Sequence, residues 1–225
     1  MSAMRHLRAR GFVCAWPAAL LAMACAAPAR GQTYDPNGTS EFALSLGYAN
    51  ISLGSSSVID SEGAFRFEPS LTFVPFRDLP QLRVGGDCGV TMVLDNSQRA
   101  IISNGGQVIF AGSSDIPLWV LEPELRISWR QSFGEDKSFF IEPGVAGGVA
   151  FGFLELDADD GSGKSYDADS STAFGRVFLR AGGRYENGMI GVEASYLAGG
   201  NLNFGGNASG DLSEFYVGFF ASLSF

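Results

Sequence analysis

The segment Leu212–Phe225, which reads LSEFYVGFFASLSF, decides the fold class. Counting back by twos from Phe225, the side chains are large and apolar or small, whereas most of the alternate positions are small or polar. Successive side chains of a β-strand point to opposite faces, so this pattern predicts a strand with one apolar face. Chain termini usually fray in soluble domains. An apolar strand that ends on an aromatic residue therefore favours a membrane barrel.

Seven further segments repeat the alternation, and each meets the ~9–11 residues that a tilted membrane strand requires. We therefore predict a single all-β domain, a transmembrane antiparallel up-and-down β-barrel of eight strands. The expected strands are 42–53, 64–75, 81–94, 116–130, 138–154, 172–185, 189–198 and 212–225.

The connections between these segments alternate between long and short, as in membrane barrels with long outer loops and short periplasmic turns. The shortest contains Asn187-Gly188, a strong signal for a two-residue hairpin turn. An even number of strands places both termini on the periplasmic side. The long connections are 54–63, 95–115, 155–171 and 199–211, and the short ones are 76–80, 131–137 and 186–188.

The spacing of Trp119 and Trp129 predicts the height of the apolar band. They share one face of an expected strand, and ten residues at ~3.3 Å, tilted by about 40°, rise roughly 25 Å. This matches the height of an apolar band with a tryptophan at each rim. Other aromatic residues are expected to continue the two girdles: Phe73, Phe139, Tyr185 and Phe225 on the inner side, and Phe65, Phe151, Phe153 and Phe215 on the outer side.

Two features complicate this pattern. Pro69, Pro123 and Pro143 each follow a glutamate within an expected strand. Proline removes a ladder hydrogen bond, so we expect bulges at these points. Residues 99–111 also read as a hairpin whose arms are too short to span a membrane. We interpret it as an outward extension of the second long loop, and a ten-stranded barrel remains the alternative.

The N-terminus reads as a secretory signal peptide, residues 1–31, followed by the barrel domain, residues 32–225. A basic stretch precedes a short apolar one, and small residues then offer cleavage after Gly31 or after Ala29. A lipoprotein with a modified Cys25 is a further alternative. Cleavage after Gly31 removes four arginines and no acid, so the formal charge changes from −9 to −13. This acidity argues against nucleic-acid binding.

The charged residues of the strands fall on the face opposite the aromatic residues. An arginine that faces lipid at mid-membrane costs ~2–4 kcal/mol, so this face must line the lumen. Seven acids and seven arginines predict a filled, salt-bridged interior, with a narrow conduction path as the alternative. The expected lumen residues are Arg66, Glu68, Arg83, Asp87, Glu122, Glu124, Arg126, Arg130, Glu142, Arg176, Arg180, Arg184, Glu193 and Glu214.

The closing strand, the alternating loops and the leader together resemble the small outer-membrane barrels of the OmpA/OmpX type. The resemblance covers residues 32–225 and includes no added periplasmic domain. It implies an assembly signal at Phe219, Leu223 and Phe225, read by the barrel assembly machinery. It also implies contact with outer-membrane lipid and lipopolysaccharide, a monomer, and a role in structural integrity, adhesion or stress resistance.

Other functions leave weaker signals. Enzymes built on small barrels use an active-site histidine, and the only histidine, His6, lies in the leader. We therefore expect no enzyme and no cofactor. Once the leader with its two cysteines is removed, Cys88 is the one cysteine left and forms no internal disulfide. The acidic residues of the 155–171 loop raise a hypothesis of weak calcium binding. Inward Phe174, Phe178 and Phe220 either line an apolar transport pocket, as in the OmpW group, or fill space between arginines.

Overall fold

The computed structural model describes residues 40–54, 56, 62–93, 100–113, 118–134, 136–158, 164–185 and 188–225. Its regular secondary structure consists of eleven antiparallel strands. They are β1 (Ser40–Leu53), β2 (Glu62–Phe73), β3 (Leu82–Val93), β4 (Ala100–Asn104), β5 (Gln107–Ser113), β6 (Leu118–Trp129), β7 (Gln131–Phe133), β8 (Phe139–Ala158), β9 (Ser165–Tyr185), β10 (Gly188–Asn203) and β11 (Ser209–Ser224).

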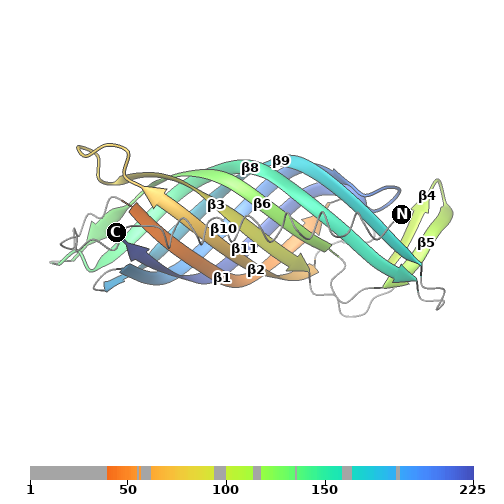
Figure 1. Cartoon of the computed structure of the whole chain (residues 1–225), viewed down its shortest axis with the longest axis horizontal. Coiled ribbons are helices and arrows are strands. Elements are labelled where there is room, and N and C mark those ends of the chain that lie inside the picture. The colour runs from red at the N-terminus through yellow and green to blue at the C-terminus, as the bar shows by residue number, and fades with distance from the viewer. Residues whose placement is uncertain are drawn as a thin grey trace.

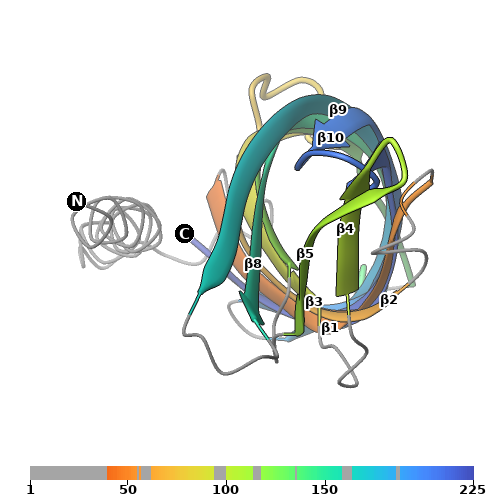
Figure 2. The same ribbon diagram turned by 90° about the vertical axis from the view of Figure 1, so that its right-hand side faces the viewer.

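Eight of these strands close into a ring, in the order β1–β2–β3–β6–β8–β9–β10–β11. The first and last strands pair without interruption from Glu41↔Ser224 to Leu53↔Leu212. Backbone hydrogen bonds between Ser40 and Phe225 continue this seam. Figure 1 shows the tilted strands of the barrel, and Figure 2 looks into one end. The predicted eight-stranded barrel is confirmed.

The hairpin formed by β4 and β5 lies outside the ring. Its turn residues Gly105 and Gly106 have φ values of 59° and 82°, a conformation that glycine adopts without strain. The hairpin joins β8 only through Gly112 and Ser113, so it extends the wall and adds no spanning strand. This agrees with the outward extension expected for 99–111. We call this the hairpin end of the barrel and the opposite end, where Phe225 lies, the terminal end (Figure 1).

The turn between β10 and β11 fastens this hairpin. The Ser103 amide donates to Asn207 Oδ1 at 2.7 Å, and Asn207 Nδ2 donates to the Ile101 carbonyl at 3.0 Å. The Asn207 amide also donates to the Ser103 carbonyl at 3.0 Å. Asn207 therefore occupies the edge of β4 as a neighbouring strand would.

Replacing Asn207 with alanine is expected to loosen the hairpin and leave the ring unchanged. The substitution removes two side-chain hydrogen bonds, each contributing about 0.5–1.5 kcal/mol. Amide hydrogen exchange should accelerate several-fold in β4 and remain unchanged in β1 and β11. Asn203→Ala, at the last residue of β10, serves as a control, because Asn203 Oδ1 accepts hydrogen bonds from Gly205 and Ser209 of the same turn rather than from β4. Equal acceleration in the ring strands would show that Asn207 supports the whole barrel.

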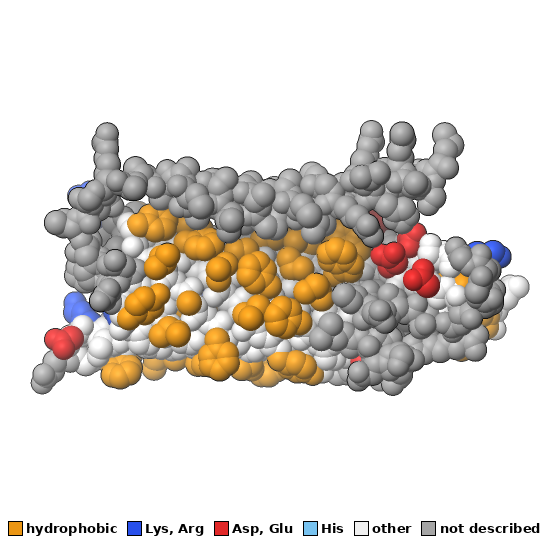
Figure 3. All heavy atoms as spheres, turned by 60° about the horizontal axis from the view of Figure 1, so that its bottom comes forward, with side chains coloured by type: hydrophobic (Ala, Val, Ile, Leu, Met, Phe, Trp, Pro, Cys, Tyr) orange, Lys and Arg blue, Asp and Glu red, His pale blue; other side chains and the backbone are white. Residues whose placement is uncertain are grey.

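The ring has the inverse polarity of a soluble domain over most of its length. Outward positions carry large exposed apolar side chains such as Leu125, Ile127 and Phe219, whereas charged side chains are buried inside. Figure 3 shows the apolar side chains spread along the outer wall, with acidic side chains near the hairpin end. Trp119 and Trp129 lie on this outward face, as do all eight aromatic residues expected to form the girdles.

The polarity reverses toward the hairpin end. Outward positions of the β8–β9 extension carry Glu155 and Asp167, which lie directly opposite each other, whereas Leu154 and Leu156 point inward. The interior here is a packed apolar core. It consists of Ala49, Ile51, Leu53, Ala64, Val93, Ile102, Leu118, Val120, Ala150, Leu154, Leu156, Phe174, Leu197, Leu202, Phe204, Ala208, Leu212 and Tyr216.

Two predicted long loops are therefore shorter than expected. Residues 155–158 and 165–171 are strand, as are 199–203 and 209–211. The middle of the 155–171 connection, residues 159–163, lies outside the described residues. Similarly, Gly188 is not a turn residue, because it pairs with Tyr185 as the first residue of β10. The other turn positions, 186 and 187, lie outside the described residues.

The predicted bulges at the prolines are wrong. The register between β2 and β3 is the same before and after Pro69, and the β6–β8 register is the same on both sides of Pro123. At each proline, the strand is unpaired with one of its two neighbours and stays paired with the other. The pairs that persist are Leu44↔Pro69, Cys88↔Pro123 and Pro143↔Leu179. The described ladders shift register only at Ala198/Asn201 and Ile102/Ser103.

No helix in the described part of the chain is long and apolar enough to cross a membrane. The expected signal peptide, its cleavage positions and Cys25 lie outside the described residues.

Candidate functional site

The lumen is the candidate functional site because each of the eight ring strands contributes at least one buried charged side chain to it. Thirteen of the fourteen residues expected there are buried, and Arg184 is half-buried. They alternate with outward-facing residues, as Glu122, Glu124 and Arg126 do on β6. Small residues make room for them: a Cβ at Gly89 would lie 2.0 Å from an Arg66 nitrogen. Glycine at that position therefore allows the guanidinium to lie flat against the wall.

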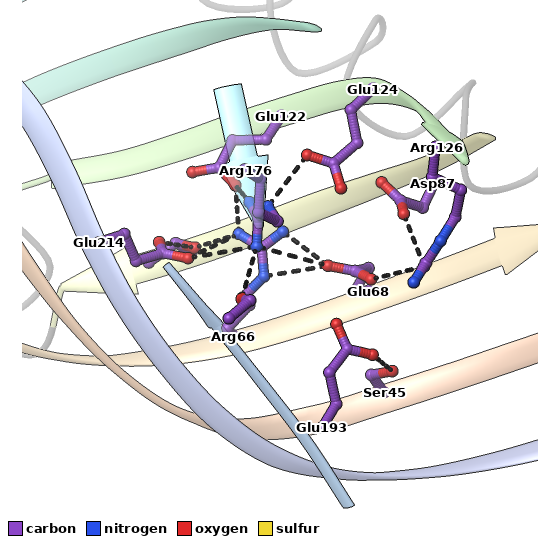
Figure 4. Close-up of polar contacts among 12 residues, drawn as sticks. Ser45, Arg66, Glu68, Asp87, Glu122, Glu124, Arg126, Arg176, Glu193 and Glu214 are labelled. Atoms are coloured by element: carbon purple, nitrogen blue, oxygen red, sulfur yellow. Dashed lines mark hydrogen bonds and ion pairs between the residues drawn. The ribbon is translucent and has the colours of Figure 1, made fainter. Parts of the chain in front are cut away.

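Most of these residues form one connected set, which we call the central network (Figure 4). Arg66 donates to Glu68 at 2.7 Å and to Glu214 at 3.0 Å, and it also contacts Glu122. Arg126 pairs with Asp87 at 2.8 Å. The members are Arg66, Glu68, Asp87, Glu122, Glu124, Arg126, Arg176, Arg180, Glu193 and Glu214.

These contacts cross the interior. Arg66 on β2 reaches Glu214 on β11, and Arg176 on β9 reaches Glu122 on β6, so each pair skips a strand of the ring. Arg176 Nε also donates to Glu124 at 3.0 Å. Uncharged side chains complete the set, because Thr91 donates to Glu214 at 2.7 Å. The central network therefore ties together strands that share no backbone hydrogen bonds.

A second set, the terminal network, lies nearer the terminal end and consists of Glu41, Arg83, Arg130 and Glu142. Arg130 pairs with Glu41 at 2.7 Å and with Glu142 at 2.5 Å, and Arg83 pairs with Glu41 at 3.3 Å. Glu41 was missed at the sequence level because the first strand was expected to begin one residue later. Its place on the inward parity of β1 was the available signal.

Aromatic rings pack against the guanidinium groups. Arg126 lies over Phe178 at 4.0 Å, and Arg180 lies over Phe220 at 5.1 Å from the ring centroid. Such contacts stabilise a desolvated cation by about 2 kcal/mol. Phe174 belongs to the apolar core at the hairpin end and approaches Arg176. Phe178 and Phe220 therefore fill space beside arginines, one of the two expectations, whereas Phe174 packs with the apolar core.

The residues of the proposed assembly signal lie elsewhere. Phe219 and Leu223 project from the outward face of β11, and Phe225, which follows the strand, is also exposed, so none of the three lines the lumen.

The barrel fold is similar to that of solved protein structures. No family model matches the sequence, and no curated protein is significantly similar to it. Neisserial surface protein A aligns with a TM-score of 0.52 at 10% identity, over 83% of this chain and 97% of that one. The chain has the fold of small outer-membrane β-barrel proteins.

Two other such barrels align with lower TM-scores. The attachment invasion locus protein of Yersinia pestis gives 0.48 at 10% identity, covering 83% of this chain and 99% of that one. The N-terminal barrel domain of Pseudomonas aeruginosa OprF gives 0.41 at 10% identity, covering 84% and 98%. At these identities the likeness concerns the outer-membrane barrel fold alone.

Proposed function

We propose that this chain is an integral outer-membrane protein with a non-enzymatic, structural or surface-interaction role in adhesion or stress resistance. One observation carries the proposal: the wall of a closed barrel is apolar outside and ionic inside. In a membrane, the charged side chains would be paired within the lumen and the apolar side chains would contact hydrocarbon, so neither set would be in an unfavourable environment. The likeness to a barrel described as a surface protein supports the same location.

The proposed partners follow from the same surface. Outer-membrane lipid and lipopolysaccharide cover the apolar wall, and the barrel assembly machinery reads the outward residues of β11 during biogenesis. The ring has no free edge between β1 and β11, which supports a monomer. The acidic outward positions Glu155 and Asp167 disfavour nucleic acid.

A heat-modifiability gel on fractionated cells tests this location. A membrane barrel resists detergent at room temperature and unfolds on boiling, so its electrophoretic mobility should shift only after boiling. The shifting band should fractionate with the outer membrane. A protein that stays in the soluble periplasm and shows no shift would defeat the proposal.

We further propose that the lumen is filled and does not conduct. The central network and its phenylalanines occupy the barrel interior, and the apolar core packs the hairpin end. Planar-bilayer recordings should therefore show no sustained channel steps. The variant Arg66→Ala with Arg176→Ala, if it folds, should raise the frequency of steps because it removes two cross-lumen side chains. Regular steps from the unmodified protein would favour the alternative, a narrow channel or a transporter for small apolar molecules.

A further inference from the structure

The central network carries more negative than positive charge. Six carboxylates and four guanidinium groups are connected by its ion pairs, which gives a formal charge of −2. The terminal network, with two of each, is neutral. All ten members of the central network are buried. Uncompensated charge in such a place is costly unless a positive species accompanies it.

Three of the six carboxylates, Glu68, Asp87 and Glu124, lie close together, and we call them the carboxylate trio. Each offers an oxygen within 4.8 Å of the others. Figure 4 shows their carboxylates turned toward one region of the lumen beside Arg126. Asp87 Oδ1 is buried and has no hydrogen-bond partner, although its Oδ2 accepts from Arg126. A buried anionic oxygen without a partner is a position that an ion or a water fills. Arg126 Nε and Nη2, on the guanidinium that pairs with Asp87, also lack partners.

The arginines around the trio leave Asp87 Oδ1 available, whereas both oxygens of Glu68 face arginines. Glu124 uses Oε2 for Arg176 at 3.0 Å, and Asp87 uses Oδ2 for Arg126. Glu68 is held from two sides, by Arg66 at 2.7 Å and by Arg126 at 3.4 Å. These contacts hold the three carboxylates in place and leave Asp87 Oδ1 without a hydrogen-bond donor. The guanidinium groups thus orient the ligands in the manner of second-shell residues at metal sites.

We propose that the carboxylate trio binds one divalent cation of the hard, oxygen-preferring class, represented by Ca²⁺. One such ion cancels the formal charge of the central network. Carboxylate oxygens are the ligands this class prefers, and their spacing is close to that around Ca²⁺, whose bonds to oxygen are about 2.3–2.6 Å. The ion links β2, β3 and β6, three adjacent strands of the ring. Because the site is buried, the ion is bound as the barrel closes.

The test is refolding of the full barrel chain into detergent micelles with excess Ca²⁺ or with chelator, followed by gel filtration and elemental analysis. We expect about one calcium per chain after refolding with Ca²⁺. The calcium-loaded protein should also unfold at a higher urea concentration than the chelator-refolded protein. Asp87→Asn and Glu124→Gln, tested separately in case one fails to fold, should each weaken calcium retention at least about tenfold.

Two controls separate this site from other carboxylates. Glu41→Gln alters a buried acid of the terminal network, and the double variant Glu155→Gln with Asp167→Asn removes acidic charge from the outer wall. Both should retain calcium as the unmodified protein does. Loss of calcium only in the double variant would place the binding on the surface and overturn the proposal. So would equal urea stability with and without Ca²⁺, the result expected if protons neutralise the trio.

Discussion

Replacing Arg66 with alanine is expected to destabilise the barrel by about 3–5 kcal/mol, the usual result of removing one partner from a buried ion pair. Arg66 is fully buried and contacts Glu68, Glu122 and Glu214. Without it three carboxylates lose a shared cation in a place that water does not reach. Native stabilities are commonly about 5–15 kcal/mol, so the loss is a large fraction of the total.

Urea unfolding in detergent, followed by the heat-modifiable gel band, measures this effect. Arg66→Lys keeps the charge but lacks the planar guanidinium that contacts several carboxylates. Its urea midpoint should therefore fall between those of Arg66→Ala and the unmodified protein. Arg77→Ala, at an exposed position outside the ring strands, is the matched control and should stay within about 0.5 kcal/mol of the unmodified protein. A midpoint for Arg66→Ala equal to that of Arg77→Ala would show that the central network contributes nothing to stability.

Replacing Leu125 with arginine is expected to impair insertion into lipid vesicles. Leu125 lies on the outward face of β6 between Trp119 and Trp129 and is 76% exposed in the isolated chain. An arginine at the bilayer midplane costs about 2–4 kcal/mol in such barrels. The folded fraction after dilution from urea into vesicles, read from the unboiled gel band, should fall sharply.

Val108→Arg is the control for this substitution. Val108 is also exposed, but it lies on β5, in the hairpin beyond the ring. The same charge placed there should leave the folded fraction unchanged. Equal folding of the two variants would mean that the outward face of β6 does not meet hydrocarbon.

The sequence predicted the ring and its polarity because strand side chains alternate strictly. A single parity choice, fixed by the cost of arginine in lipid, assigned Arg126, Arg176 and Arg180 to the interior together. Errors arose where the environment changes along a strand. Past the apolar band, Glu155 and Asp167 face outward and Leu156 faces inward, so the pattern inverts and reads as an acidic loop.

The individual ion pairs were beyond prediction from the sequence. Partners such as Arg66 and Glu214 lie on strands that do not pair with each other, so neither hairpin register nor turn length fixes their distance. The stagger of the strands around the closed ring decides which inward residues share a level. The prolines misled for a related reason, because Pro69 and Pro123 interrupt the ladder on one side without changing register.

A nitroxide scan along β11 in a Cys88→Ser background shows which face of the strand meets hydrocarbon. Single cysteines replace Phe215, Tyr216, Val217, Phe219 and Phe220 in turn, and collision rates with oxygen and with a water-soluble nickel complex are measured in vesicles. We expect high oxygen contact at 215, 217 and 219, and low contact with both reagents at 216 and 220. Nickel contact at 215, 217 and 219, or the absence of a two-residue period, would show that the outward face of β11 does not lie in the membrane.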